Sequence, residues 1–203
     1  MNDMRVALLP FLAVSILGGC FGWKYDTTYA GVPFSKVRVE RDLAIGMISE
    51  DTVIAGRPCK RGWVHLKPNG IPVGFTASRD IPLERFTIPA DTWVFQDAAG
   101  NVTVCAFPRN TKVQGHLCKG GWGGSEGVQA AFYPDGALKQ YYLTVDTEVQ
   151  GVPCKAGALN ESVELYANGR IKACALSRDF VSGGRTYTGG SRVRFSPEGR
   201  VVD

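Results

Sequence analysis

One short motif occurs five times along this chain, and this repetition constrains the fold more than any other feature. An acidic or amide residue is followed five positions later by Gly in four copies, and Arg takes the Gly position in the remaining copy. The copies are Asp51/Gly56, Asp80/Arg85, Asn110/Gly115, Asp146/Gly151 and Asp179/Gly184, and their first residues are 29, 30, 36 and 33 positions apart. A period of this size predicts a repeat architecture in which neighbouring units bury a shared core, rather than a single enzyme domain.

Each repeat also carries the signature of a β-hairpin. Turn sequences recur at 68–70, 97–100, 134–136, 167–169 and 197–199. Several contain Asn-Gly or Asp-Gly, which favour tight turns because these residues tolerate positive φ. Ahead of the turns apolar residues alternate, as in Val64 and Leu66, so the strands are half-buried and His65 is expected to be a solvated side chain. After the turns the apolar residues shift from one set of alternate positions to the other, which predicts a β-bulge.

The chain is therefore expected to be essentially all-β: an antiparallel array of about five hairpin units. No sustained helical period occurs after the first twenty residues. The anchor acids are best explained by hydrogen bonds from their side chains to backbone groups that fix the turns. Residues 132–139, Phe-Tyr-Pro-Asp-Gly-Ala-Leu-Lys, resemble the hairpin core of MORN repeats, and residues 165–172 are similar. This MORN-like resemblance implies an elongated sheet that serves as a binding or scaffolding surface without catalysis.

The N-terminal segment indicates where the protein is located. Residues 6–19 form an uncharged, largely apolar run of 14 residues after Arg5, which is typical of a secretory signal. A membrane-spanning helix needs ~20 residues. The Leu-Gly-Gly-Cys string ending at Cys20 resembles the lipobox of bacterial lipoproteins, which implies cleavage after residue 19 and a lipid on Cys20. Phe21 in the next position favours, by the same resemblance, the outer membrane.

We therefore predict a signal peptide over 1–19, a tether over 20–34 that begins at the lipidated cysteine, and a single β-hairpin repeat domain over 35–203. Cleavage removes Asp3 and Arg5, so the net charge stays at +4. There is no block of Lys or Arg, and nucleic acid is not expected as a partner. No catalytic set, cofactor motif or metal-ligand spacing stands out, so none of these is expected.

The cysteines fall into two recurring positions. If Cys20 is lipidated, five remain: Cys59, Cys118 and Cys154 lie eight positions after an anchor, and Cys105 and Cys174 lie five positions after a turn Gly. An oxidising envelope compartment permits disulfides, and positions that recur in neighbouring strands can come within bonding distance. The predicted bridges are Cys154 to Cys174 and Cys105 to Cys118, with Cys59 left over. The alternative is that all five are small buried residues; a nucleophilic role would need a basic neighbour such as His116.

Three tryptophans are the candidate ligand-binding residues. Trp63 and Trp122 occupy equivalent places in two repeats, and Trp93 precedes the strand of the degraded copy. An exposed row would stack on sugar rings or anchor a partner, whereas a buried row would be repeat packing. Trp122 lies in a Gly-rich insertion over 120–127, and loops on rigid scaffolds often carry binding residues.

The sequence thus predicts a non-catalytic envelope lipoprotein, held on a membrane through the lipid on Cys20. Its first expected function is that of a structural or protein-interaction module with an envelope protein partner. The alternative is a protein that binds a glycan or a peptidoglycan fragment through Trp63, Trp93 and Trp122. Exposure of the tryptophans separates the two, and an envelope hydrolase ranks third because no catalytic set is visible.

Overall fold

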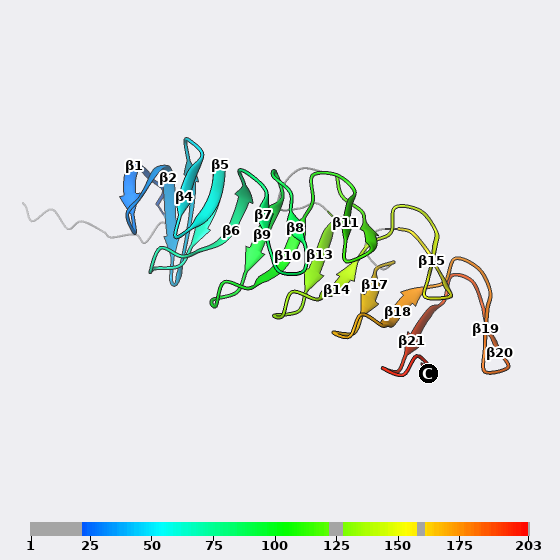
Figure 1. Cartoon of the computed structure of the whole chain (residues 1–203). Coiled ribbons are helices and arrows are strands. Elements are labelled where there is room, and N and C mark those ends of the chain that lie inside the picture. Colours follow the sequence, from blue (N-terminus) through cyan, green and yellow to red (C-terminus); the bar gives the residue numbers. More distant parts are fainter. Residues whose placement is uncertain (1–21, 122–127, 158–160, 203) are drawn as a thin grey trace, which may run out of the picture.

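The computed structural model describes residues 22–121, 128–157 and 161–202. In these ranges all regular secondary structure is β-strand, and successive antiparallel hairpins follow one another from the blue N-terminal end to the red C-terminal end (Figure 1). The predicted all-β array of hairpins is confirmed.

Fourteen of the described strands form one large antiparallel sheet. Its order is β1 (Lys24–Tyr29), β2 (Val32–Glu40), β3 (Leu43–Ile48), β5 (Arg57–Leu66), β6 (Pro72–Ala77), β9 (Trp93–Gln96), β10 (Val102–Ala106), β13 (Gln129–Phe132), β14 (Leu138–Tyr141), β17 (Val163–Leu165), β18 (Ile171–Ala175), β21 (Arg192–Phe195) and β22 (Val201–Val202), with β4 (Thr52–Ile54) paired to β5. The large hairpins are β5/β6, β9/β10, β13/β14, β17/β18 and β21/β22. Because the strands of the large sheet follow one another in chain order, with a small hairpin between successive large ones, the array grows by addition of hairpins.

The large hairpins close with one recurring turn. In β13/β14 the Tyr133 N–H donates to the Ala137 carbonyl at 2.8 Å, and the Gly136 N–H donates to the Tyr133 carbonyl at 2.9 Å. The same two bonds occur in the other four large hairpins. Gly136 has a φ of 78°, as required in a turn followed by a bulge. Register shifts beside four of the turns confirm the predicted bulge.

Smaller hairpins precede the large ones. They are β4 with the start of β5, β7 (Ile81–Pro82) with β8 (Thr87–Ile88), β11 (Thr111–Val113) with β12 (His116–Cys118), β15 (Thr147–Val149) with β16 (Val152–Cys154), and β19 (Phe180–Ser182) with β20 (Arg185–Tyr187). In every one, the anchor side-chain oxygen accepts the backbone N–H of the residue ten positions later. The pairs are Asp51 to Arg61 (2.8 Å), Asp80 to Ala90 (2.8 Å), Asn110 to Gly120 (3.1 Å), Asp146 to Ala156 (2.7 Å) and Asp179 to Gly189 (2.8 Å). The predicted structural role of the anchors is confirmed, although the bond closes the base of the hairpin rather than its turn.

The core lies between one face of the large sheet and the small hairpins. Sheet residues such as Val64 and Leu66 are buried in one cluster with small-hairpin residues such as Ile88, Val113 and Val149. Side chains of alternate residues point to the opposite side of the sheet. We call this side the open face, because no small hairpin covers it.

The predicted tether over 20–34 is wrong from Lys24 onward. β1 and the start of β2 fall in this segment and pair with each other, for example Tyr29 with Val32 and Thr27 with Phe34. Val32 and Phe34 are buried in the core cluster. The folded domain therefore begins before residue 35. This hairpin contains no copy of the anchor motif, so the repeat pattern did not predict it.

Candidate functional site

Aromatic side chains gather on the open face near the N-terminal end of the large sheet. Strand β5 contributes Trp63 and His65, strand β9 contributes Trp93 and Phe95, and Trp23 lies just before β1. The register brings them together, because His65 pairs with Gly74 of β6 and Gly74 pairs with Phe95. Residues separated by up to 72 positions therefore share one surface.

The three tryptophans and His65 line a pocket of about 510 Å³, which we call the aromatic pocket. Its lining consists of Trp23, Arg38, Ile45, Gly62, Trp63, His65, Thr76 and Trp93. The ring centroids of Trp23 and Trp63 are 5.7 Å apart, and those of His65 and Trp93 are 5.6 Å apart. Tilted and edge-on contacts at these separations are typical of favourable aromatic pairs.

Glycine makes room for this arrangement at one position. A Cβ added at Gly74 would lie 3.0 Å from His65 Nδ1 and 3.2 Å from Phe95 Cε1. The two rings therefore meet over the backbone of β6, in space that a side chain would occupy. Burial lowers the pKa of His65, so its imidazole is neutral at pH 7. His65 lies on the predicted polar face of its strand, but contacts with the neighbouring aromatic rings leave it only partly exposed.

Two cations of β2 border the aromatic pocket. Lys36 Nζ lies 4.9 Å from the ring centroid of Trp63 and 5.5 Å from that of Trp23. The Arg38 guanidinium lies 5.1 Å from the Trp23 centroid and pairs with Glu40 at 2.5 Å. Cation–π contacts at partly exposed sites each contribute about 0.5–1 kcal/mol. No carboxylate lies within ion-pair distance of Lys36 in the described part of the chain.

Two buried donors at the pocket lack a partner. The indole Nε1 of Trp93 and the Nε of Arg38 are both inaccessible, and neither has a hydrogen-bond acceptor among the described residues. Both residues line the aromatic pocket. An unsatisfied buried donor costs the folded protein roughly 1–3 kcal/mol, and a ligand in the pocket does not remove this cost because it cannot reach an inaccessible atom.

The three predicted tryptophans differ in position and in exposure. Trp63 and Trp93 lie at the same pocket, although they come from different repeat positions. Trp63 is 37% exposed, whereas Trp93 is only 4% exposed. Trp122, like Cys20, lies outside the described residues. Sequence reasoning missed Trp23 because the tether prediction covered it; the β-favouring Thr27, Thr28 and Tyr29 that follow were the available signal.

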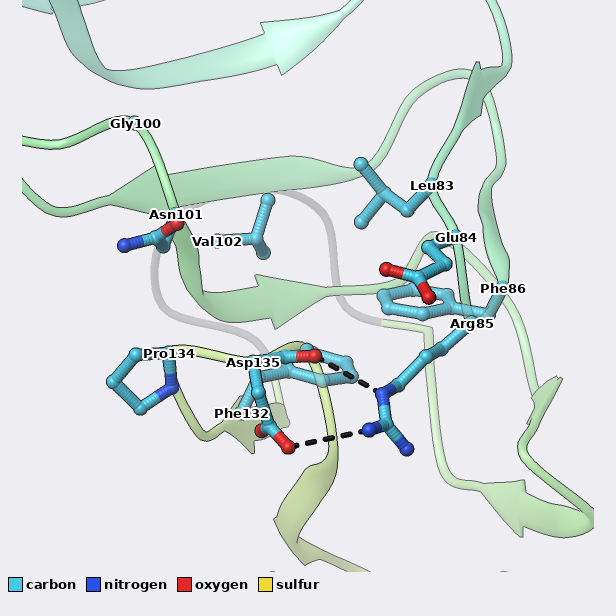
Figure 2. A pocket seen from close by; sticks show the side chains of 11 residues that line it. Leu83, Glu84, Arg85, Phe86, Gly100, Asn101, Val102, Phe132, Pro134 and Asp135 are labelled. Carbon is cyan, nitrogen blue, oxygen red and sulfur yellow. Dashed lines mark hydrogen bonds and ion pairs between the residues drawn. The ribbon is translucent and has the colours of Figure 1, made fainter.

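A second pocket, of about 210 Å³, lies beside β7/β8 and the turns of the next large hairpins (Figure 2). The Phe86 and Phe132 rings stack with centroids 4.7 Å apart and planes inclined by 7°. The Arg85 guanidinium donates to the Asp135 carbonyl at 3.0 Å and to its carboxylate at 3.3 Å. Arg85 stands where the other copies have Gly, so this departure from the motif serves a contact between repeat units. The ring stack and the Arg85–Asp135 contacts join neighbouring repeat units across this pocket.

The cysteines described here lie in the core. All five are buried thiols, and no disulfide joins them in the described residues. Cys154 donates to the Cys174 sulfur, with the two sulfur atoms 2.6 Å apart. This hydrogen bond and burial raise the pKa of Cys154. Burial raises the pKa of Cys105, and Cys118 contributes further.

A nucleophilic cysteine finds no support in this geometry. Burial raises the pKa of Cys118 to about 12, which keeps the thiol protonated at neutral pH. The imidazole of His116 contacts the Tyr141 hydroxyl at 2.8 Å instead of the thiol. The Cys118 sulfur itself donates weakly to the His116 carbonyl at 3.8 Å.

The chain matches no protein-family model and no curated protein sequence, so the site is interpreted from its own chemistry. Among the described residues, no group of three or more His, Cys, Asp or Glu side chains is placed to hold a metal ion. Nor does this part of the chain contain a helix long and apolar enough to cross a membrane.

Proposed function

We propose that this protein is a non-catalytic lipoprotein of the bacterial envelope that binds a saccharide at the aromatic pocket. The observation that carries the proposal is the convergence of Trp23, Trp63 and Trp93 on one pocket of the open face. An aromatic pocket with a few polar groups is the usual composition of a small-ligand site. Trp63 retains enough exposed ring for stacking, while the buried Trp93 forms part of the pocket wall.

Saccharide binding is tested with Trp63→Ala in the full-length protein in non-ionic detergent. Screening against immobilised glycans, peptidoglycan fragments included, is expected to give binding that the variant loses. Phe180→Ala, which removes an aromatic ring at the other end of the molecule, is the control and is expected to bind normally. Absence of any glycan binding by the wild-type protein would refute this function.

The lipid anchor is the second part of the proposal and depends on Cys20. Two acyl chains or more hold a protein firmly on a membrane, which a single chain does not. Growth with a labelled fatty acid is expected to label the wild type and not Cys20→Ser. Cys59→Ser, which alters a buried thiol, is expected to retain the label. Labelling of Cys20→Ser would contradict lipidation at this residue, and membrane fractionation would show whether the outer membrane is the location.

The structural or protein-interaction function is the second candidate, and a different surface favours it. Apolar side chains on the small-hairpin side are exposed: Val53 by 59%, Leu117 by 50%, Val145 by 65% and Val181 by 66%. In-cell cross-linking is expected to capture an envelope protein if this surface binds one. Loss of the captured protein in Leu117→Lys and Val181→Lys, with glycan binding intact, would favour this function over the first.

We also propose that Cys154 and Cys174 form a disulfide in an oxidising envelope. Their sulfurs are already adjacent, and 20 residues separate them in sequence. A bridge closing a loop of this size stabilises a protein by roughly 3 kcal/mol. Alkylation under non-reducing conditions followed by peptide mass spectrometry is expected to recover the linked peptides. Alkylation of both thiols in protein from the envelope would refute the bridge, and the same experiment tests Cys105 with Cys118.

A further inference from the structure

The charges and hydrogen-bond donors at the aromatic pocket indicate which chemical class of saccharide it binds. We propose that the pocket binds an acidic saccharide, one whose sugar ring carries a carboxylate. This inference rests on the proposed saccharide function and adds the chemical class of the ligand.

The charged groups at the pocket that a ligand can reach are donors. Lys36 Nζ has no carboxylate partner among the described residues, and the Arg38 side chain is 33% exposed. A ligand that pairs with them has to supply oxygen acceptors. A carboxylate meets this need best, because it offers two oxygens and only accepts when ionised.

The surrounding charge is also suited to an anion. Lys36 and Arg38 both border the pocket, and Glu40, which pairs with Arg38, offsets one of these two positive charges and leaves the other. Neutral His65 adds no charge of either sign at pH 7. The local balance is therefore positive, and the low-polarity walls formed by Trp23 and Trp63 strengthen its effect on a bound anion.

The aromatic rings explain why the anion is expected on a sugar. Trp63 is exposed and Lys36 lies over its ring, so a sugar stacked on the indole would bring a substituent within reach of this cation. A simple inorganic anion would leave this apolar surface unused. The combination of an aromatic wall with cations at its edge fits a ring that has an apolar face and an acidic edge.

The test uses a matched pair of probes: tetragalacturonate and the same oligosaccharide with its carboxyl groups methyl-esterified. Binding to the full-length protein in non-ionic detergent is followed by tryptophan fluorescence and isothermal titration calorimetry. We expect the acidic probe to bind at least tenfold more tightly than the ester. We also expect its affinity, but not that of the ester, to fall as the salt concentration rises.

Variants locate the binding at the pocket. Arg38→Gln is expected to weaken binding of the acidic probe at least tenfold and to leave the ester unchanged. Lys36→Gln, which removes the cation that lies over the Trp63 ring, is expected to weaken it severalfold. Arg194→Gln removes the same charge from the exposed C-terminal end of the open face and is expected to have no effect. Circular dichroism and thermal unfolding confirm that each variant is folded.

The outcomes separate this inference from the function on which it rests. Equal affinity for both probes would overturn the acidic ligand and leave saccharide binding in place. Binding of neither probe, nor of any glycan in the screen, would overturn both. Arg38-dependent binding to phosphatidylglycerol vesicles without binding of the acidic probe would assign the pocket to a lipid surface and also overturn the inference.

Discussion

The two faces of the large sheet differ in how strictly they repeat. Three residues before each large-hairpin turn begins, the core face carries Val64, Val94, Ala130, Val163 and Val193, all of them buried. One position later, the open face carries His65, Phe95, Ala131, Glu164 and Arg194. The core face is uniform because every unit must bury it against the small hairpins and its neighbours. The open face has no such constraint, so its chemistry varies along the sheet and becomes distinctive at the aromatic pocket.

The largest expected effect tests this difference with one residue type on both faces. Phe75→Ala on the core face, where the ring is fully buried, should lower the free energy of unfolding by about 3–5 kcal/mol. Phe95→Ala, on the open face of the adjacent strand, should cost clearly less because its ring is only partly buried. Urea denaturation measures both. Equal losses would show that the open face is packed as tightly as the core.

The next effect concerns the anchor that every unit shares. Asp146→Ala should lower the free energy of unfolding by about 0.5–1.5 kcal/mol, because the Ala156 N–H loses its acceptor. Asp146→Asn should cost less, since Asn110 makes the same bond in another unit. Thermal unfolding of the two variants provides the comparison. If Asn were as damaging as Ala, the negative charge rather than the hydrogen bond would be the stabilising feature.

A smaller effect is expected at the C-terminal end of the open face. Glu164 lies 2.6 Å from Arg192 and 3.5 Å from Lys172, and all three side chains are partly exposed. Glu164→Gln should therefore cost less than about 1 kcal/mol. Because solvent and salt screen such pairs, the difference from wild type should shrink when stability is measured in 0.5 M NaCl. A cost that is large and insensitive to salt would mean that this end of the face is structurally essential.

The smallest expected effect is a pH dependence of folding stability, to which one histidine on each side of the sheet contributes. Burial lowers the pKa of His65 on the open face and of His116 in a small hairpin. The unfolded chain then binds protons at higher pH than the folded one, so stability is complete above pH ~6.5 and falls as the pH decreases below it. Thermal unfolding at pH 7.5 and 5.5 should show this decline. Replacing both histidines with Gln should flatten it; an unchanged decline would assign the titration to other groups.

Much of the fold could be predicted because the local structure of each repeat is determined by residues close together in sequence. The Asn-Gly and Asp-Gly turns, the alternation at Val64 and Leu66, and the anchor acids all act over a few residues, where the chain's own geometry decides the outcome. The tether prediction failed because β1 carries no copy of the motif. Its assignment to the sheet depends on pairing with β2, which alternation alone did not reveal.

The candidate site was predictable only in part. Trp63 and Trp93 stand out as tryptophans, but their meeting at one pocket depends on strand register across β5, β6 and β9. Trp23 joins them only because β1 and β2 extend the sheet at its edge. The burial of Trp93 and the neutral state of His65 follow from these contacts, and no pattern within either strand specifies them.

The sequence by itself determined an all-β array of hairpins, the turns that close it, and which residues face the core, since these properties follow from short-range geometry and from the periodicity of apolar side chains. The tertiary structure alone decided which side chains become neighbours across strands. That decision placed Cys154 against Cys174 and gathered three tryptophans, a neutral histidine and two cations around one pocket. The reason is physical: pairing of strands distant in sequence is set by the whole sheet, whereas each turn is set by its own few residues.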